Sequence, residues 1–238
     1  MAQPSRLNRT LSFLLRREVS GDANSQAAAI IEDVSDNDIQ QVASADFPTR
    51  WGTFRIYGFR GHSGSDGDRR VEEAVALVTG DVKSSPPLVR IHSQCLTGDV
   101  FHSLRCDCRQ QLELSLSLIA EEGAGILIYE LQEGRGIGLM AKLQAYELQD
   151  AGLDTVEANQ RLGFKNDYRD FALPAQILKS LGVTRVRLLS NNPEKVEALE
   201  RARVHVVERV PCEVTPSPHA EEYLKTKKEK LGHLFTSG

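Results

Sequence analysis

The first half of the chain alternates apolar and polar residues over short segments separated by turns. Trp51–Phe59 alternates in the way typical of a β-strand with one buried face. A run rich in glycine, serine and aspartate follows at 61–68, and residues 73–78 and 88–93 then predict two further strands. Because short loops join these segments, we predict that the sheet opens with antiparallel strands.

In the second half, segments with helical character alternate with apolar runs. We predict helices that end at Gly123, begin near Leu139, span Pro174–Gly182 and follow the N-cap Asn192, with strands over 125–129 and 186–189. Strands that alternate with helices predict an α/β fold. We therefore expect a mixed β-sheet with flanking helices in a single domain.

The length and composition are those of a globular protein. Of the 238 residues, 40% are apolar and 26% are charged, and the formal net charge is −4. The acidic balance argues against nucleic acid as a partner, and no apolar run approaches the length that spans a membrane. Four cysteines, three of them close together, do not resemble a secreted disulfide framework. We predict a reducing, cytoplasmic location, with Cys212 as a small packing residue.

Residues 1–38 differ from the rest of the chain. Arginines interleave with leucines and serines before the first acid, Glu18, which weakly resembles an organellar transit peptide. Such a stretch is more often a disordered or loosely docked extension. We therefore predict a flexible extension over 1–38 and a folded domain over 39–238, with a linker-like composition across 19–46.

Three cysteines form the most informative motif, Cys95-x10-Cys106-x-Cys108. Three thiolates at this spacing suit one zinc ion, which prefers four-coordinate tetrahedral geometry. A water in the fourth position would make the site catalytic, whereas a fourth ligand such as His92 or His102 would make it structural. The three residues could also be ordinary thiols. The spacing alone leaves these alternatives open.

Two polar stretches could bind an anionic ligand. Gln132–Gly138 lies between a predicted strand and a predicted helix, where backbone amides can approach a ligand, with Glu133 as acceptor and Arg135 as donor. Its spacing is not that of a dinucleotide fingerprint, and a glycine-rich turn is the alternative. Asp167 and Arg169 could activate a water and hold a phosphate, or form an ordinary surface salt bridge.

A third stretch, Ser190–Lys195, lies at a predicted helix N-terminus, where phosphate binds readily and Lys195 adds a point charge. A capping turn alone would explain Ser190 and Asn192. Together with the cysteines, these basic residues favour zinc–water chemistry on a phosphorylated base or sugar. Zinc nucleobase deaminases are the nearest generic class, but their paired motifs are absent.

Several runs closely resemble the GTP cyclohydrolase II family, whose enzymes open riboflavin biosynthesis. The resemblance covers roughly residues 40–235, with the motifs in the order and spacing of the family. The matching runs are Val89–Asp99, Ser103–Cys108, Gln132–Leu139, Asp154–Asn159, Leu162–Phe164, Asp167–Phe171 and Asn191–Lys195.

The resemblance implies a catalytic domain that hydrolyses GTP to formate, pyrophosphate and a 2,5-diamino-6-ribosylamino-pyrimidinone 5′-phosphate. It implies that Cys95, Cys106 and Cys108 hold one zinc ion per subunit, whose water attacks C8 of guanine. Mg²⁺ is expected with the triphosphate, and Tyr146 is expected to assist formate release. A homodimer is the family expectation.

The resemblance also assigns the remaining site residues. Asp167 is expected to accept a proton, and Arg169 to attack the α-phosphorus or, because a guanidinium stays protonated, to stabilise transition-state charge. Glu133 is suited to accept hydrogen bonds from guanine. The residues expected to contact the nucleotide are Arg90, Ile91, His92, Ser93, Gln94, Gln111, Glu133, Gly134, Arg135, Thr155, Ser190 and Lys195.

Two residues depart from the family pattern. Gln94 stands where the family often has Glu, which removes a negative charge beside a predicted zinc ligand, and Ser190 stands where it often has Thr, which keeps the hydroxyl. Two alternative functions stay open. One is a paralogue that opens the imidazole ring but retains the formyl group, and the other is a zinc-stabilised nucleotide-binding module without turnover.

Overall fold

The computed structural model describes residues 39–63, 70–165 and 167–215, together with positions 217, 220, 226, 232 and 234. The extension predicted over residues 1–38 lies outside the described residues. Among the described residues, seven strands form one mixed sheet. None of the helices in this part of the chain combines the length and the apolar character that crossing a bilayer would require.

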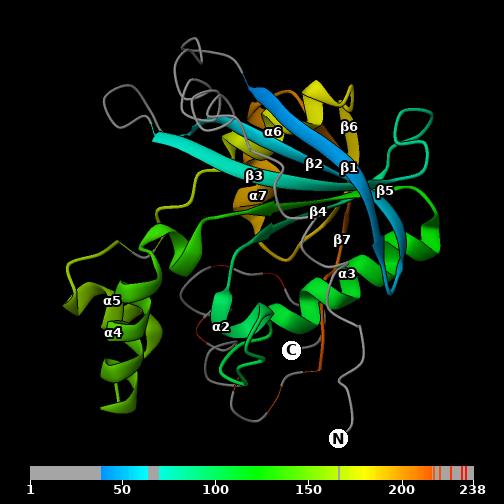
Figure 1. Cartoon of the computed structure of the whole chain (residues 1–238). Helices are drawn as coiled ribbons and strands as arrows, with labels where there is room; N and C mark the ends of the chain where they lie inside the picture. The colour runs from blue at the N-terminus through cyan, green and yellow to red at the C-terminus, as the bar shows by residue number, and fades with distance from the viewer. Residues whose placement is uncertain are drawn as a thin grey trace, which may run out of the picture. The chain divides into compact units, whose positions relative to one another are not determined.

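The sheet has an antiparallel half and a parallel half (Figure 1). Its strands are β1 (Gln40–Thr49), β2 (Gly52–Ser63), β3 (Arg70–Thr79), β4 (Leu88–Ser93), β5 (Gly125–Glu130), β6 (Arg185–Leu189) and β7 (His205–Val210). They lie in the order β1-β2-β3-β5-β4-β6-β7. β1, β2, β3 and β5 pair antiparallel in turn, whereas β5, β4, β6 and β7 pair in parallel.

The predicted fold class is confirmed, with two corrections to individual strands. The strand over 88–93 does not belong to the antiparallel opening, because β4 pairs in parallel with β5 and β6, which follow it in sequence. The linker predicted across 19–46 is wrong for 40–46, which lie in β1. β1 is an edge strand with no buried residue, so no buried face imposes an apolar alternation on its sequence.

The helices begin and end near the predicted boundaries. They are α2 (Leu96–Asp99), α3 (Cys108–Glu122), the 3₁₀ turn η1 (Glu133–Gly136), α4 (Leu139–Asp150), α5 (Thr155–Arg161), α6 (Ala172–Ser180) and α7 (Pro193–Arg201). α3 ends at Gly123 in the left-handed conformation, and the Asn192 side chain caps α7 by accepting the Glu194 N–H at 3.0 Å. α6 begins two residues before the predicted Pro174. The sequence patterns did not indicate α2, α5 or β7.

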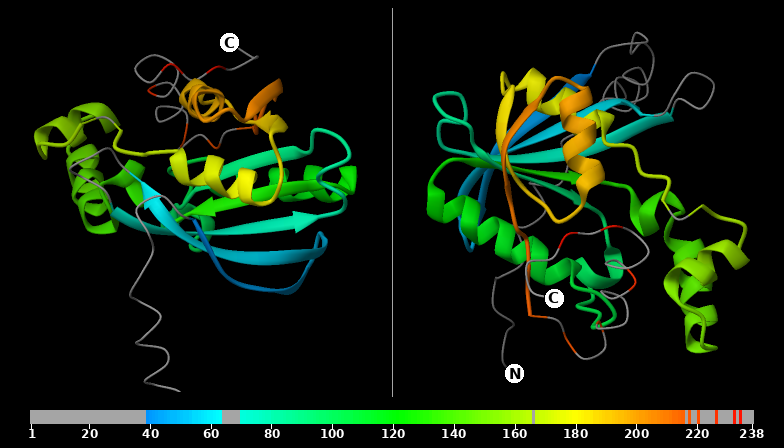
Figure 2. Two further views of the ribbon diagram at one scale, coloured as in Figure 1. Left: turned by 90° about the horizontal axis from the view of Figure 1, so that it is seen from above. Right: turned by 180° about the vertical axis from the view of Figure 1, so that it is seen from behind.

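Alternate residues of the central strands pack on opposite faces of the sheet, as the period of a strand requires. On one face, Ile91 and Ile128 belong to a core that includes Leu178 of α6 and residues of α7. On the other face, Leu127 belongs to a core with Ile119 of α3. α6 and α7 therefore cover one face and α3 the other, which the two views of Figure 2 allow the reader to follow.

The direction in which successive parallel strands are added to the sheet reverses at β4. From β4 it runs through α3 to β5 on one side of β4, and from β5 it runs through α6, on the opposite face, to β6 on the other side. Parallel sheets leave a crevice at the carboxyl ends of the strands where such a reversal occurs. The helices α4 and α5 pack on each other and lie away from the sheet in Figure 1.

Gly80 allows the chain to turn closely after β3. Its φ is +67°, and an added Cβ would overlap the carbonyl oxygen of Gly123 and lie 2.9 Å from Cα of Ala124. We expect Gly80→Ala to lower the free energy of unfolding by at least ~2 kcal/mol, because alanine is strained at this φ and the opposing atoms are backbone. Urea unfolding followed by circular dichroism measures the loss.

The matched control is Gly58→Ala in β2, where an added Cβ meets no atom within 4 Å. Its stability should change by less than ~1 kcal/mol, because alanine is tolerated in a strand. Equal losses in the two variants would contradict the explanation.

Candidate functional site

A pocket lies at the carboxyl ends of β4, β5 and β6 and is lined by almost every predicted site residue. The two exceptions are Ile91 and Asp167. Ile91 is fully buried in the core, and its carbonyl accepts a hydrogen bond from Nζ of Lys195 at 2.8 Å. Asp167 binds the guanidinium of Arg169, which does line the pocket. Segments far apart in sequence therefore meet at one site.

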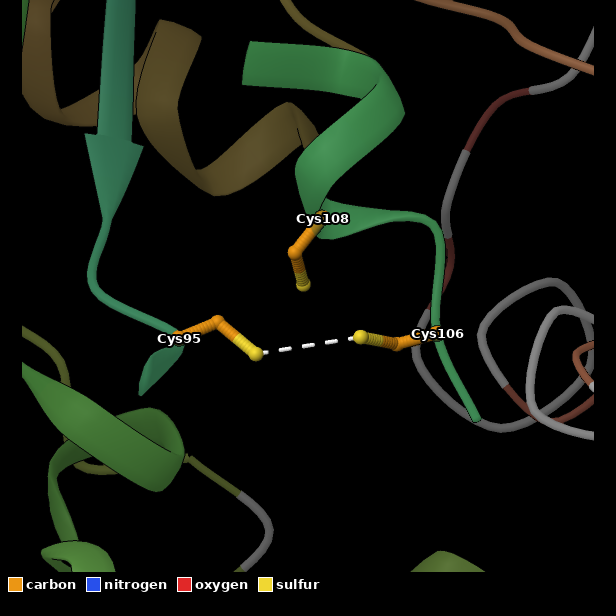
Figure 3. Close-up of side chains that lie close together, drawn as sticks. All are labelled: Cys95, Cys106 and Cys108. Atoms are coloured by element: carbon orange, nitrogen blue, oxygen red, sulfur yellow. Dashed lines mark hydrogen bonds between the residues drawn. The ribbon is translucent and has the colours of Figure 1, made fainter. Parts of the chain in front are cut away.

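Three cysteines line this pocket, and Figure 3 shows their side chains close together. The Sγ atoms of Cys95, Cys106 and Cys108 all lie within 4.8 Å of one another, and those of Cys95 and Cys106 are 3.7 Å apart. Two sulfurs on one tetrahedral zinc ion would be about 3.8 Å apart, given the usual Zn–S bond length. The three thiols are therefore spaced as ligands of a single metal ion. We call them the three-cysteine cluster.

The backbone around the three-cysteine cluster leaves room for the sulfurs. A Cβ added to Gly98 of α2 would lie 3.0 Å from Sγ of Cys106 and 3.1 Å from Sγ of Cys95. Among the described residues, no histidine or carboxylate atom joins the cluster as a further ligand. The donor set fits zinc with three protein ligands, which is the arrangement of catalytic zinc sites.

Lys142 of α4 contacts the cluster and links it to Glu133. Its Nζ donates to Sγ of Cys95 at 3.2 Å and to Oε1 of Glu133 at 2.7 Å. Burial opposes the charge, but Cys95 and Glu133 raise the pKa of Lys142 above its usual value. Hydrogen bonds from Cys106 and Cys108 hold the pKa of Cys95 well below its usual range. Without a metal ion, negative charge is therefore favoured on the sulfur of Cys95, whereas hydrogen bonds with Cys106 and Cys95 raise the pKa of Cys108 well above its usual value.

Glu133 is held by three hydrogen bonds. Besides Lys142, it accepts the backbone N–H of Leu96 at 2.7 Å and that of Gly134 at 2.9 Å. These contacts connect η1 to the loop that carries Cys95.

A buried network orients the same loop from the other side. Asp99 accepts hydrogen bonds from the backbone N–H of Cys95 at 3.0 Å and from the hydroxyl of Tyr129 at 2.8 Å. Nε2 of His92 lies 3.1 Å from the carboxylate, and the His92 ring stacks on Tyr129. Burial lowers the pKa of His92, so its ring is neutral and donates from Nε2 to Asp99. His92 therefore supports the loop of Cys95, and its ring lies outside the group of three possible metal ligands.

Tyr146 lies one helical turn beyond Lys142 and faces the same loop. Its hydroxyl is 3.2 Å from Oγ1 of Thr97, and the guanidinium of Arg105 lies 4.8 Å from the centre of its ring. Burial raises the pKa of Tyr146, so the phenol keeps its proton at neutral pH. Tyr146, the tyrosine predicted to be catalytic, thus lines the same pocket as the three-cysteine cluster with its hydroxyl protonated.

Cationic side chains form another part of the pocket. Lys195 is buried, and its Nζ lies 5.1 Å from the ring centre of Phe171. Burial and the charges of Arg90 and Arg169 lower the pKa of Lys195 well below its usual range. Arg90 donates to Oε1 of Gln111 at 2.6 Å. An anionic ligand would relieve the repulsion among these cations.

Arg169 is paired within the site. Its Nη2 lies 2.5 Å from Oδ2 of Asp167, and its Nη1 lies 3.4 Å from Oγ of Ser93. Burial alone would raise the pKa of Asp167, but hydrogen bonds and charge from Arg169 lower it below its ordinary value. Both side chains are less than one-fifth exposed, so the pair is not an ordinary surface salt bridge.

Ser190 and Asn192 form the capping turn that was the alternative to a phosphate site. The backbone N–H of Asn192 donates to Oγ of Ser190 at 3.1 Å. Both residues nevertheless line the pocket, so the turn places the N-terminus of α7 beside the cationic side chains.

The sequence matches the family model described as GTP cyclohydrolase II over residues 40–211. This chain belongs to the GTP cyclohydrolase II family. It is 52% identical over 199 residues to GTP cyclohydrolase-2 from Buchnera aphidicola, covering 83% of this chain and 100% of that protein. It is 54% identical over 202 residues to GTP cyclohydrolase-2 from Escherichia coli O9:H4, covering 83% and 98%.

Other relatives of this GTP cyclohydrolase II family member are longer. It is 53% identical over 199 residues to the riboflavin biosynthesis protein RibBA of Aquifex aeolicus, covering 83% of this chain and 48% of that protein. The chain thus spans about half the length of that relative. Membership of the family connects the chain with riboflavin biosynthesis.

The structure also identifies residues of the pocket and its surroundings that the sequence patterns did not indicate. Lys142 could have been found from helical spacing, because it lies four residues before Tyr146 on the same face of α4. Glu130, at the end of β5, carried no such signal. It is buried beside Ser93 and Gln132, and burial raises its pKa to about 8. Cys212 is buried away from the cluster, with Sγ 3.7 Å from Oγ of Ser115, as expected of a packing residue.

Replacing a cluster cysteine should remove the bound metal. We expect Cys95→Ser, Cys106→Ser and Cys108→Ser each to lower zinc from about one ion per chain to below about a tenth of that, because two thiolates cannot hold zinc against dialysis. Mass spectrometry of the metal content measures the loss. Cys212→Ala is the control and should keep its zinc. A cluster variant that keeps full zinc would exclude that residue as a ligand.

Proposed function

We propose that this chain hydrolyses GTP at a zinc centre, releasing formate and pyrophosphate and leaving 2,5-diamino-6-(5-phosphoribosylamino)pyrimidin-4(3H)-one. The observation that carries the proposal is that one pocket combines the three-cysteine cluster with Arg90, Arg169 and Lys195. A metal site for attack on the base and cations for a triphosphate are the two requirements of this reaction. Membership of the GTP cyclohydrolase II family supports the same choice.

The three-cysteine cluster would hold the zinc ion. A zinc ion with three protein ligands supplies Lewis acidity and an activated water, which hydrolysis at C8 of guanine requires. Tyr146 supports the later, formate-releasing step, because its phenol is protonated and lines the same pocket. Thr97 holds the Tyr146 hydroxyl in place.

The triphosphate would bind among the cations near the N-terminus of α7. Lys195 and Arg90 supply positive charge there, and the backbone N–H groups of a helix N-terminus favour anions. Nε of Arg90 and Nδ1 of His92 are buried without a hydrogen-bond partner among the described residues. Buried polar atoms normally have partners, so a polar ligand or water is expected to meet them. Mg²⁺ would accompany the triphosphate and screen its charge.

Arg169 would stabilise negative charge on the α-phosphate during departure of pyrophosphate. Its ion pair with Asp167 supports this role over that of a nucleophile, because the carboxylate keeps the guanidinium charged. Asp167 is the proton acceptor in the proposal. Its lowered pKa keeps it ionised and able to orient Arg169.

Glu133 would face the guanine. An ionised carboxylate offers about four acceptor positions, and three of them are occupied by Leu96, Gly134 and Lys142. Accepting both the N1–H and the exocyclic amine of guanine would therefore require one of these donors to move. Lys142 is the donor with a flexible side chain.

The family likeness also supports a domain organisation, a location and an oligomeric state for the whole protein. Residues 39–238 would form the catalytic domain, following an extension over 1–38. The enzyme would act as a cytoplasmic homodimer.

Incubating the purified protein with GTP, Zn²⁺ and Mg²⁺ should release formate and pyrophosphate in equal amounts with a diaminopyrimidine nucleotide. Mass spectrometry identifies the nucleotide, and coupled enzymatic assays quantify formate and pyrophosphate. Treatment with a chelator should lower turnover at least about tenfold, since the activated water depends on the metal.

Each other product pattern has a definite meaning. Intact GTP, despite tight binding at every pH, would identify a binding module and overturn the proposal. A ring-opened nucleotide that keeps its formyl group would identify the paralogue instead.

Binding of GTP should become weaker as the pH rises through the lowered pKa of Lys195. The triphosphate favours the protonated lysine, so binding takes up a proton, and the affinity should fall by up to about tenfold per pH unit. Calorimetry with a non-hydrolysable GTP analogue from about pH 6 to about pH 9 tests this. Lys195→Arg keeps its charge throughout and should lose this pH dependence. If GTP binding to the wild type and to Lys195→Arg showed the same pH dependence, a group other than Lys195 would be responsible.

A further inference from the structure

Lys142 reaches the three-cysteine cluster from a helix that supplies none of its thiols. Its ammonium group donates to Sγ of Cys95 at 3.2 Å and to Glu133 at 2.7 Å. The side chains of Lys142 and Glu133 are only 12% and 8% exposed. These hydrogen bonds therefore form where water screens charge weakly.

The contacts form a closed ring around Cys95. Lys142 bonds to the sulfur, Glu133 bonds to Lys142, and Leu96, the residue after Cys95, donates its backbone N–H to Glu133 at 2.7 Å. Such a ring constrains both the sulfur and the backbone of one metal ligand. The same ring contains the residue that would face guanine.

The positive charge of Lys142 would affect the reactivity of a metal ion bound to Cys95. Three thiolates and one Zn²⁺ carry a net charge of about −1, and such an electron-rich centre activates water poorly compared with one held by neutral ligands. An ammonium group that donates to one thiolate withdraws electron density from that sulfur. With zinc bound, the sulfur would therefore donate less to the metal and leave it a stronger Lewis acid.

We propose that Lys142 is a positioning residue of the metal centre, which acts through Cys95 to lower the electron donation of the thiolates and ties this ligand to Glu133. The proposal rests on the zinc site of the proposed function. It assigns Lys142 a role in tuning the metal rather than in retaining it.

The test compares Lys142→Met with the wild type, both loaded with Co²⁺ in place of zinc and without GTP. Loss of the N–H···S hydrogen bond should move the thiolate-to-cobalt charge-transfer band to longer wavelength, because the sulfur electrons are no longer stabilised by the ammonium. In the zinc-loaded proteins, alkylation of Cys95 by iodoacetamide should become about tenfold faster in the variant, which corresponds to one charge-assisted hydrogen bond. Peptide mass spectrometry locates the alkylated residue.

Two further variants separate charge from packing. Lys142→Gln keeps N–H donors but has no charge, so it should shift the band in the same direction by a smaller amount, and it serves if Lys142→Met fails to fold. Lys179→Met, which removes an exposed lysine of α6, should match the wild type. In turnover, Lys142→Met should lower kcat by about 10–100-fold while the metal content stays that of the wild type.

The outcomes separate this proposal from the proposed function. An unchanged band and an unchanged alkylation rate in Lys142→Met would overturn the tuning role, and so would loss of the metal, which would make Lys142 a structural residue. A wild type that binds zinc but leaves GTP intact would overturn the proposed function alone. A wild type that binds neither zinc nor Co²⁺ would overturn both.

Discussion

Backbone hydrogen bonding of β4 to two parallel neighbours, β5 and β6, determines where the reactive groups can gather. Because α3 and α6 return the chain on opposite faces, the loops after these strands separate and leave a crevice. Cys95 follows β4, Glu133 follows β5, and the turn at Ser190 follows β6. Each loop therefore supplies a different part of the site, and the sheet sets their spacing. The helices α4 and α7 then bring Lys142 and Lys195 to the same crevice.

Charge is balanced locally within this crevice. Lys142 lies between Cys95 and Glu133, and Arg169 is bound to Asp167. In these two places each buried ion has an opposite charge in contact, which reduces the cost of removing it from water. Lys195 is the contrasting case, because the nearby arginines and its own burial both disfavour its proton. The cationic part of the crevice therefore favours an anionic ligand, while the cysteine part favours a metal cation.

Local patterns predicted those features that depend on neighbouring residues. The Asn192–Pro193 start of α7 and the Gly123 end of α3 follow from short-range backbone preferences. The spacing of three cysteines offered a shared metal site as one of several alternatives, and the structure brings their sulfurs together. The parallel pairing of β4 could not be predicted in this way, since its partners lie later in the chain. β1 carried no signal because it buries no face. Glu130 acquires its raised pKa only from burial in the folded protein.

The attachment of α4 has a consequence for the motions of the chain. α4 fully buries only Ala145, and it is joined to the cysteine loop by Lys142, by Tyr146 and by the ion pair of Asp150 with Arg105. Polar attachments of this kind define a cooperative unit that opens at lower free energy than the core of the sheet. A metal ion on the thiols binds the closed form and so adds to that free energy. Amide hydrogens of α4 should therefore exchange more slowly when a metal ion is bound to the three cysteines. Their exchange would report metal binding although α4 supplies none of the metal ligands.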